Sequence, residues 1–465
     1  MQKITELIPN KKVHFVGIGG VGMSGLAQLL LEQGYYVIGS DLKKTRNTDR
    51  LEALGATIFF SHRAENLKDV DIVVYSSCIR EDNPELEAAK KKNIKIIKRG
   101  LLLAFLMQGK TGIVIAGAHG KTTTTSLISL LLNTAGMNPS FAIGADLDAL
   151  GGNASHGLGE YFVAEADESD GSFLCLHPDY AVITNIDKEH LDYYQDMAHI
   201  VRTYAEFIAN LNPQGILFCY GEDAHIKQAL KSYKGQLVTY GFSEHCDARA
   251  INMSFSDMQS EFECIYRNEI SIKFKLSVPG QHNILNALAC IAVGIKLGID
   301  LDIIQKALEA FKGAKRRFEV RSKNDRVIIV DDYAHHPTEI NATLQAAKSW
   351  KNRRLVGVFQ PHRYSRTKFL QEEFAHCFDC ADQIIITDIY AASEQPIKGI
   401  AARTIYDQVK KSGHKNVFFS PRSELKQHLL DNVQAGDILM LLGAGDINDL
   451  SEELSENFSK QIEVN

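Results

Sequence analysis

The segment TGIVIAGAHGKTTTTSLISLLL, residues 111–132, decides the fold of this chain. A run of apolar residues leads into a short loop bounded by two glycines, and a longer, largely apolar segment follows. This order predicts a strand ending at Ala116, a phosphate-binding loop and a helix. The backbone N–H groups of such a loop can surround a polyphosphate, and the helix dipole favours negative charge at the same place.

The residues of this loop are typical of a nucleoside triphosphate site. Lys121 would bring a positive charge to the outer phosphates, and the Thr122 hydroxyl would reach a Mg²⁺ ion. The loop is shorter than the usual G-x-x-x-x-G-K-[ST], because Ile115 stands where the first glycine is expected and the loop opens at Gly117. A glycine-rich helix start that binds nothing is the alternative. We expect nucleotide contacts from Gly117, Ala118, His119, Gly120, Lys121, Thr122 and Thr123.

Length and composition indicate an ordinary globular protein. A chain of 465 residues usually forms two or three domains, and 45% hydrophobic with 23% charged residues is an average composition. The net charge of −6 and the pI near 6.3 argue against a nucleic-acid or membrane-surface partner, which would favour a basic protein. The N-terminal segment MQKITELIPNKK lacks the apolar core of a signal peptide, so we expect a cytoplasmic protein.

The eight cysteines are scattered along the chain, and a cytoplasmic protein of this size needs no disulfides. Cys377 and Cys380 form one C-x-x-C within FLQEEFAHCFDCADQ, which we predict to be a helix. No second pair completes a zinc site, so packing in the core is favoured over metal or redox chemistry.

A dinucleotide-type glycine pattern lies near the N-terminus. After a predicted strand at residues 12–17, Gly17, Gly19 and Gly22 satisfy G-x-G-x-x-G, and a second strand at residues 35–39 leads to Asp41. Taken alone this predicts NAD binding, but a UDP-sugar satisfies the same geometry. The alternative for Asp41 is a helix cap. Further strands at residues 72–76 and 94–97 complete a small α/β sheet that ends near residue 106.

The central part of the chain offers metal ligands at predicted strand ends. A strand at residues 161–164 runs into Glu165, where folds of this kind hold Mg²⁺. A strand at residues 180–184 leads to His190, a further ligand or a structural residue. Alternating residues from 237 to 278, with a turn at 267–269, predict an antiparallel flap, and a helix follows from about residue 281. Asn283 near its start could cap it or contact the nucleotide.

The C-terminal part predicts a second doubly wound sheet. After a basic connector at residues 314–321, strands at residues 327–330, 355–359, 384–387 and 438–442 alternate with helices. Polar clusters, DDYAHHP at residues 331–337 and QPHRYSR at residues 360–366, follow two of these strands and predict a ligand site. The histidines lack zinc-binding spacing, whereas guanidinium groups suit phosphates and carboxylates.

An ordered series of motifs carries a resemblance to a known family. The motifs are HFVGIGGVGMSGLA, GAHGKTTTT, EADESDGSF, TNIDKEHLDYY, GQHNILNALA, RRFE, DDYAHHPTEI and QPHRYSRT. In these the chain resembles the Mur ligases, the ATP-dependent amino-acid-adding enzymes of peptidoglycan synthesis, over nearly its whole length. The resemblance implies a three-domain α/β fold: a Rossmann-like UDP-sugar domain (1–106), a central P-loop ATPase-like ATP domain with the antiparallel flap (107–314) and a Rossmann-like domain for the amino acid (315–465).

The likeness is greatest to the members that add alanine. It implies that L-alanine is joined to the lactyl carboxylate of UDP-N-acetylmuramate through an acyl phosphate, with ATP and Mg²⁺, by a monomer or weak homodimer. The metal ligands implied are Thr122, Glu165 and His190. The implied ATP contacts beyond the loop are Asn283, Arg317 and Asp332. The implied substrate contacts are Gly19, Gly20, Gly22, Met23, Asp41, Tyr333 and His362, and the implied catalytic residues are Lys121, His335, Arg363 and Arg366. His335 is the candidate for deprotonating the amine.

The chain departs from the family pattern at one place, and several alternatives stay open. Other Mur ligases carry a lysine that becomes carbamylated and helps to hold a second Mg²⁺, but RTYAEFIAN at residues 202–210 contains no lysine. A relative that attaches a whole tripeptide to the same UDP-sugar shares two of the motifs. An NAD-dependent oxidoreductase and a nucleotide-driven switch are the rival classes. Alanine, serine and glycine all remain as incoming amino acids, because pocket shape decides among them.

Overall fold

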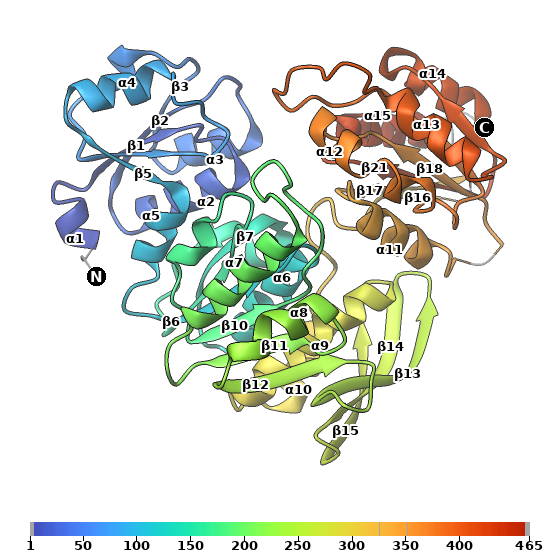
Figure 1. Cartoon of the computed structure of the whole chain (residues 1–465), viewed down its shortest axis with the longest axis horizontal. Coiled ribbons are helices and arrows are strands. Elements are labelled where there is room, and N and C mark those ends of the chain that lie inside the picture. The colour runs from blue at the N-terminus through green and yellow to red at the C-terminus, as the bar shows by residue number, and fades with distance from the viewer. Residues whose placement is uncertain (1–3, 325, 351, 461–465) are drawn as a thin grey trace. The chain divides into compact units, whose positions relative to one another are not determined.

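The computed structural model describes residues 4–324, 326–350 and 352–460, so the outermost residues of the predicted terminal domains lie outside it. By its contacts the chain forms two compact units. The first comprises Met1–Ile251, Cys264–Ile272 and Leu285–Ala310. The second comprises Asn252–Glu263, Lys273–Ile284 and Phe311–Asn465. The three-domain α/β class predicted from the sequence is confirmed. Along the chain, a parallel sheet comes first, a mixed sheet follows, and a largely parallel sheet comes last (Figure 1).

The N-terminal sheet is parallel and has the strand order β3-β2-β1-β4-β5. Its strands are β1 (Lys12–Val16), β2 (Tyr36–Ser40), β3 (Thr57–Phe59), β4 (Ile72–Tyr75) and β5 (Lys95–Lys98). The helices are α1 (Ile4–Leu7), α2 (Val21–Glu32), α3 (Arg46–Ala53), α4 (Pro84–Lys91) and α5 (Arg99–Leu106). This is the predicted Rossmann-like arrangement. Strand β3 was missed, because its three residues are too few to show a period.

The central sheet has the order β15-β14-β13-β12-β11-β10-β6-β9-β7-β8 among the described residues. Its first strands are β6 (Thr111–Ala116), β7 (Ser140–Leu147), β8 (Gly152–Ser155), β9 (Tyr161–Glu165) and β10 (Tyr180–Ile183). The others are β11 (Ile216–Tyr220), β12 (Gln236–Gly241), β13 (Ala248–Ser256), β14 (Gln259–Tyr266) and β15 (Ile270–Leu276). Ile113, Val114 and Ile115 of β6 are fully buried, which explains its continuous apolar run. The predicted turn lies between β14 and β15, where Arg267 and Asn268 have positive φ.

The central helices are α6 (Lys121–Thr134), α7 (Met197–Ala209), α8 (Ala224–Ala229), α9 (Gln281–Lys296) and α10 (Leu301–Ala310). The apolar face of α6, including Leu127 and Leu131, is buried, and α10 packs against this helix. The helix predicted from residue 281 is present. Its suggested cap is wrong: Asn283 is the third residue of α9, and its Nδ2 donates to the Pro279 carbonyl at 2.7 Å.

The C-terminal sheet has the order β16-β17-β21-β18-β19-β20, with β16 antiparallel to β17. Its strands are β16 (Glu319–Lys323), β17 (Val327–Asp332), β18 (Leu355–Phe359), β19 (Gln383–Ile386), β20 (Val417–Phe419) and β21 (Asp437–Leu442). Its helices are α11 (Pro337–Ala347), α12 (Tyr364–Phe369), α13 (Ala402–Lys411), α14 (Arg422–Asn432) and α15 (Ile447–Lys460). The second doubly wound sheet is thus confirmed.

Two local predictions in this sheet are wrong. The basic connector contains an edge strand, β16, because its alternating residues pair with β17. The helix predicted around Cys377 and Cys380 is broken into α12, a short 3₁₀ turn (Glu373–Ala375) and further turns. Cys377 is buried, as expected of a core residue, and all eight cysteines are free thiols.

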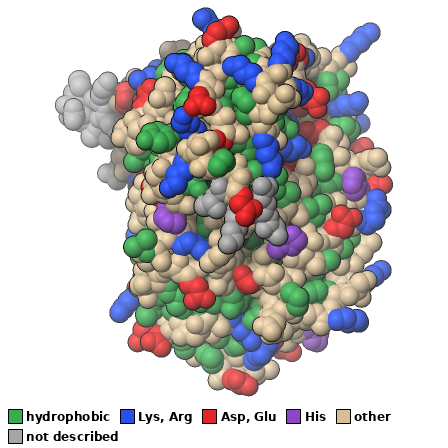
Figure 2. Space-filling view, turned by 90° about the vertical axis from the view of Figure 1, so that its left-hand side faces the viewer, with side chains coloured by type: hydrophobic (Ala, Val, Ile, Leu, Met, Phe, Trp, Pro, Cys, Tyr) green, Lys and Arg blue, Asp and Glu red, His purple; other side chains and the backbone are tan. Residues whose placement is uncertain are grey.

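The surface carries both signs of charge. On the face that Figure 2 shows, Lys and Arg side chains are interspersed with Asp and Glu rather than gathered into one basic patch. Within the described residues, no helix combines the length and apolar character needed to cross a membrane.

Candidate active site

Three neighbouring parallel strands deliver the predicted phosphate-loop and metal residues to one edge of the central sheet. Strand β6 lies between β9 and β10, with Ile115 opposite Glu165 and Ala116 opposite Ile183. The loop after β6, the acid at the end of β9 and the residues after β10 therefore meet at the carboxyl ends of the strands. Ligands of open α/β sheets bind at this edge.

The two glycines of the loop are required by its geometry. Gly117 has φ +140°, and a Cβ atom there would lie 2.0 Å from Thr184 Oγ1. Gly120 has φ +79°, and a Cβ atom there would lie 2.5 Å from Asn286 Oδ1. A side chain at either position would meet both backbone strain and a steric clash. The spacing G-x-x-G is thus fixed by close packing against two neighbouring segments.

The loop is held in place by the segment that follows β10. The N–H of Ala118 donates to the Asn185 carbonyl at 3.1 Å, and the N–H of His119 donates to Asn185 Oδ1 at 2.9 Å. The Thr184 hydroxyl donates to the His119 carbonyl at 2.6 Å. Helix α6 starts at Lys121, and the first N–H groups of a helix have no partner inside it. The loop and these amides form a preorganised cradle for an anion.

Lys121 curls over this loop and meets a buried acid that the sequence analysis missed. Its Nζ donates to the Ala118 carbonyl at 3.0 Å and to Glu168 Oε1 at 2.8 Å. Glu168 is 3% exposed, and His190 Nε2 lies 3.5 Å from the same oxygen. Burial raises the pKa of Glu168, but Lys121 and His190 outweigh burial and the pKa is lowered. The acidic EADE run was the available signal, but it does not show which carboxylate turns inward.

The oxygen atoms suited to magnesium come from Thr122 and Glu165. The Thr122 hydroxyl donates to Glu165 Oε1 at 3.0 Å, and the Gly144 N–H donates to Glu165 Oε2 at 2.7 Å. A hydroxyl and a carboxylate in contact beside a phosphate loop match the hard oxygen ligands that Mg²⁺ prefers. His190 has φ +54° and directs Nε2 toward Glu168. The structure therefore brings Thr122 and Glu165 together and places His190 beside Glu168, which binds Lys121.

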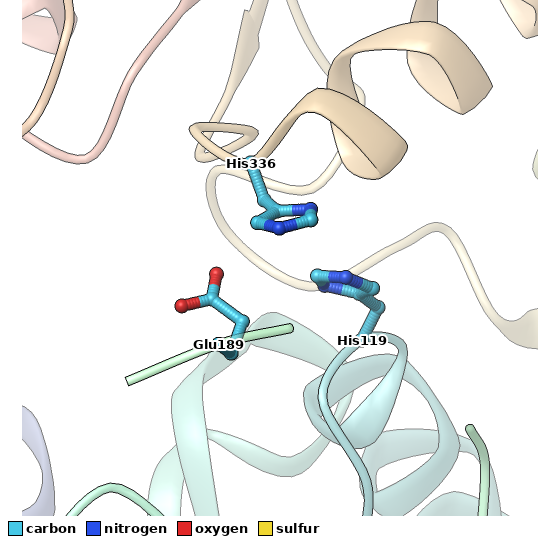
Figure 3. Close-up of side chains that lie close together, drawn as sticks. All are labelled: His119, Glu189 and His336. Atoms are coloured by element: carbon cyan, nitrogen blue, oxygen red, sulfur yellow. The ribbon is translucent and has the colours of Figure 1, made fainter. Parts of the chain in front are cut away.

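A second group of polar side chains lies beside the loop. His119 Nε2 is 3.0 Å from Asp187 Oδ2, and ligand atoms of His119 and Glu189 lie within 4.8 Å of one another (Figure 3). In the C-terminal unit, His336 is the N-cap of α11, and its Nδ1 accepts the N–H of Thr338 at 3.3 Å. Helix capping gives His336 a structural role within its own unit.

The N-terminal glycine loop is braced by Asp41. The N–H of Gly19 donates to Asp41 Oδ2 at 2.8 Å, and Asn47 Nδ2 donates to the Gly19 carbonyl at 2.9 Å. The helix-cap alternative for Asp41 is wrong, because Thr45 is the N-cap of α3. Gly20 is the N-cap of α2, and the Met23 side chain is buried in the core. Only the backbone of Met23 is therefore left to face a substrate.

The C-terminal unit gathers aromatic and basic residues predicted for the site. The guanidinium carbons of Arg316 and Arg317 lie 5.0 and 5.1 Å from the centre of the Tyr333 ring. The His335 ring meets the rings of Tyr333 and His362 edge-on, with centroids 5.3 and 5.7 Å apart. Arg366 Nη1 lies 3.1 Å from His362 Nδ1. The five predicted residues Arg317, Tyr333, His335, His362 and Arg366 thus form one cluster, which we call the aromatic–arginine cluster.

Two further predicted residues of this unit, Arg363 and Asp332, hold the backbone. Arg363 is the N-cap of α12 with φ +68°, and its N–H donates to the Tyr390 carbonyl at 2.9 Å. The Asp332 carboxylate is buried and accepts the N–H groups of Phe318 and Ala334 at 2.9 and 2.8 Å. Burial raises the pKa of Asp332 to about 6, although Arg317 opposes the shift. Asp332 fixes the turn that presents the cluster.

Three family models together cover most of the chain. The Mur ligase family, catalytic domain model matches residues 12–111. The Mur ligase middle domain model matches residues 115–294, and the Mur ligase, glutamate ligase domain model matches residues 316–445.

Curated relatives match at nearly full length. The chain is 46% identical over 447 residues to the UDP-N-acetylmuramate–L-alanine ligase of Trichlorobacter lovleyi, covering 96% of this chain and 98% of the relative. It is 48% identical over 440 residues to the enzyme of the same name from Geobacter sulfurreducens, covering 94% and 95%. Among solved structures, the UDP-N-acetylmuramate-alanine ligase of Thermotoga maritima matches with a TM-score of 0.84 and 31% identity, covering 97% of this chain and 99% of that one.

Proposed function

The chain belongs to the Mur ligase family, and on this premise we propose that it joins L-alanine to the lactyl carboxylate of UDP-N-acetylmuramate at the expense of ATP. The product is a peptidoglycan precursor. The observation that carries this assignment beyond similarity is the preorganised loop, with Lys121 beside it and the Thr122–Glu165 oxygen pair at its end.

The reaction needs an activated carboxylate, because a carboxylate is a poor electrophile and amide formation in water is uphill. The lactyl carboxylate attacks the γ-phosphate of ATP, which gives an acyl phosphate and ADP. The amine of L-alanine then attacks the acyl carbon, and the tetrahedral intermediate expels phosphate. Positioning and charge neutralisation account for most of the catalysis in phosphoryl transfer.

The residues of the first unit would carry the phosphoryl transfer. Lys121 would exchange part of its contact with Glu168 for the β- and γ-phosphates, which the loop of residues 117–123 would surround. Their oxygens would accept from the amides at the start of α6, because the N–H groups of Ala118 and His119 already donate to Asn185. Thr122 and Glu165 would hold Mg²⁺, with His190 as a further candidate ligand. A bound Mg²⁺ would neutralise charge on the transferred phosphoryl group. The Gly19 loop with Asp41 would hold the UDP-sugar.

The residues of the second unit would handle the reacting carboxylate and the alanine. Arg366 and Arg363 would bind anionic oxygens, with Tyr333 and His362 shaping the pocket. His335 Nδ1 lies 2.8 Å from the Tyr333 carbonyl, a contact that orients the imidazole ring, and His335 is the proposed acceptor of the proton that the amine loses. Asn283, Arg317 and Asp332 are proposed to complete the ATP site.

Phosphate release in the presence of defined substrates tests the proposal. We expect release only when ATP, Mg²⁺, UDP-N-acetylmuramate and L-alanine are all present, with a product whose mass rises by one alanyl residue. Release with the tripeptide but not with alanine would assign the chain to peptidoglycan recycling. Release without any UDP-sugar would indicate a nucleotide switch, and tight NADH binding would indicate an oxidoreductase. Serine and glycine serve as competitors for amino-acid selectivity.

The setting of the enzyme is part of the same proposal. We infer that it acts in the cytoplasm, where ATP and nucleotide sugars are found, as a monomer or weak homodimer. Sedimentation at catalytic concentrations measures the oligomeric state. A stable higher oligomer would contradict this part.

A further inference from the structure

Arg99 links the N-terminal glycine loop to the acidic loop of the central sheet. It is the first residue of α5 and lies directly after β5. A Cβ atom at Gly22 would lie 2.5 Å from Arg99 Nη1, so the guanidinium covers the first turn of α2. The same guanidinium forms an ion pair with Asp167, two residues after Glu165. Nothing in the sequence pattern distinguished either residue.

Asp167 belongs to the short segment that also carries the ATP-site acids. Its Oδ1 accepts the N–H of Ser169 at 2.9 Å, and its carbonyl accepts the N–H of Phe173 at 3.1 Å. Its neighbour Glu168 is the partner of Lys121. The Arg99–Asp167 pair therefore joins the start of α5, beside the N-terminal glycine loop, to the acidic segment that follows β9.

This ion pair is placed where an anionic substrate can compete for it. The side chains of Arg99 and Asp167 are 24% and 26% exposed, so water reaches both. A pair that water reaches is less costly to break than a fully buried one. A diphosphate at the start of α2 would offer the guanidinium more charge and two oxygens in the geometry that arginine binds best.

We propose that Arg99 binds the diphosphate of the UDP-sugar at the start of α2, and that Asp167 competes with the substrate for it. The inference rests on the proposed function and assigns a specificity residue within its substrate site. Glycine is then needed at position 22, because any side chain there would displace the arginine from the first turn of α2. Binding of the sugar nucleotide would free Asp167 and change the charge next to Glu168.

The experiment is calorimetric titration of the full-length protein with UDP and with UDP-N-acetylmuramate, in the absence of ATP. Arg99→Ala should weaken the binding of both ligands by about tenfold to a hundredfold, the usual effect of losing a charge-assisted contact. The affinity of Arg99→Lys for both ligands should lie between that of Arg99→Ala and that of the wild type. Asp167→Asn should bind both ligands at least as tightly as the wild type, because it releases the guanidinium.

A matched control is Arg80→Ala, since Arg80 is an exposed arginine of the same domain, paired with Asp82 at 2.9 Å. It should leave both dissociation constants unchanged. Equal weakening in Arg99→Ala and Asp167→Asn, together with equal losses in melting temperature, would show a purely structural pair and overturn the inference. Weakening with UDP-N-acetylmuramate but not with UDP would move the contact to the sugar carboxylate and overturn the diphosphate assignment.

The inference and the proposed function fail in different ways. If the wild type binds neither ligand, the proposed function itself is wrong. If the wild type binds both and Arg99→Ala binds them equally well, only the role of Arg99 is wrong.

Discussion

The ammonium of Lys121 lies 2.8 Å from Glu168 Oε1, and the carboxylate of Glu168 is almost completely buried. A lysine placed to meet phosphates is thus held by an internal anion. Substitution can separate the role of Lys121 in the fold from its role in the reaction. Removing Lys121 leaves a buried carboxylate without its counter-charge, whereas neutralising Glu168 leaves a lysine that can still bind phosphate.

Lys121→Met should abolish phosphate release and also destabilise the protein, by roughly 3–5 kcal/mol, because it leaves Glu168 buried without its strongest counter-charge. Glu168→Gln should cost about 1–3 kcal/mol, the usual penalty for a lost buried hydrogen-bond partner. The double variant should recover most of the stability and none of the activity. Thermal unfolding and phosphate release measure the two effects. Additive losses in the double variant would show that the pair is not coupled.

Stability at acidic pH should depend on a buried carboxylate in the N-terminal sheet. Glu85 accepts from the Ser40 hydroxyl and from Asn66 Nδ2, both at 2.5 Å, and its Oε2 lies 3.2 Å from His14 Nε2. Burial raises the pKa of Glu85, but His14, Ser40 and Asn66 outweigh burial and lower it. Its folded pKa is below the unfolded value, so this stabilisation is present above about pH 4.3 and is lost as the pH falls through the folded pKa.

The matched pair for this prediction is Glu85→Gln and Glu87→Gln on the same helix, α4, because Glu87 is exposed. Glu85→Gln should lower the melting temperature at pH 7 and reduce its fall between pH 5 and pH 3. Glu87→Gln should track the wild type throughout. Parallel curves for the wild type and Glu85→Gln would exclude Glu85 as a source of the acid sensitivity.

The sequence predicted the elements whose pattern is local and strong. The apolar run after residue 111 predicted a strand ending at Ala116, where β6 ends, because a fully buried parallel strand is continuously apolar. The positions of Thr122, Glu165 and His190 after predicted strands also indicated one sheet edge, because the carboxyl ends of parallel strands lie together. Strand β16 was missed because its basic residues indicated a connector, and its pairing with β17 is a tertiary contact that the local sequence does not show.

The inward turn of Glu168 and the Arg99–Asp167 pair escaped prediction for a related reason. Each depends on which of several neighbouring charges meets a partner distant in sequence: Lys121 is 47 residues from Glu168. Four acids within residues 165–170 are equivalent in a linear pattern. Only the fold distinguishes the one that meets a lysine from the one that meets an arginine.

The glycines of the phosphate loop should tolerate alanine less well than a surface glycine of similar conformation. Gly120 has φ +79° and Gly136 has φ +73°, but only Gly120 has an atom close to the position of a Cβ. Gly136→Ala should cost about 1 kcal/mol for the left-handed backbone alone. Gly120→Ala adds displacement of Asn286, so we expect the KM for ATP to rise at least tenfold while that for the UDP-sugar stays constant. An unchanged KM for ATP would show that the phosphate loop does not bind the nucleotide.

The metal dependence should follow the hydroxyl of Thr122 rather than its shape. Thr122→Ser keeps the oxygen that contacts Glu165 at 3.0 Å, whereas Thr122→Val keeps the volume and loses the oxygen. If this oxygen binds Mg²⁺, Thr122→Val should require about tenfold more Mg²⁺ for half-maximal phosphate release, and Thr122→Ser should be close to the wild type. Mn²⁺ titration followed by electron paramagnetic resonance, with a non-hydrolysable ATP analogue, reports the site without turnover. Equal Mn²⁺ affinity in the two variants would show that the Thr122 hydroxyl only orients Glu165, and that the metal is held by other oxygens.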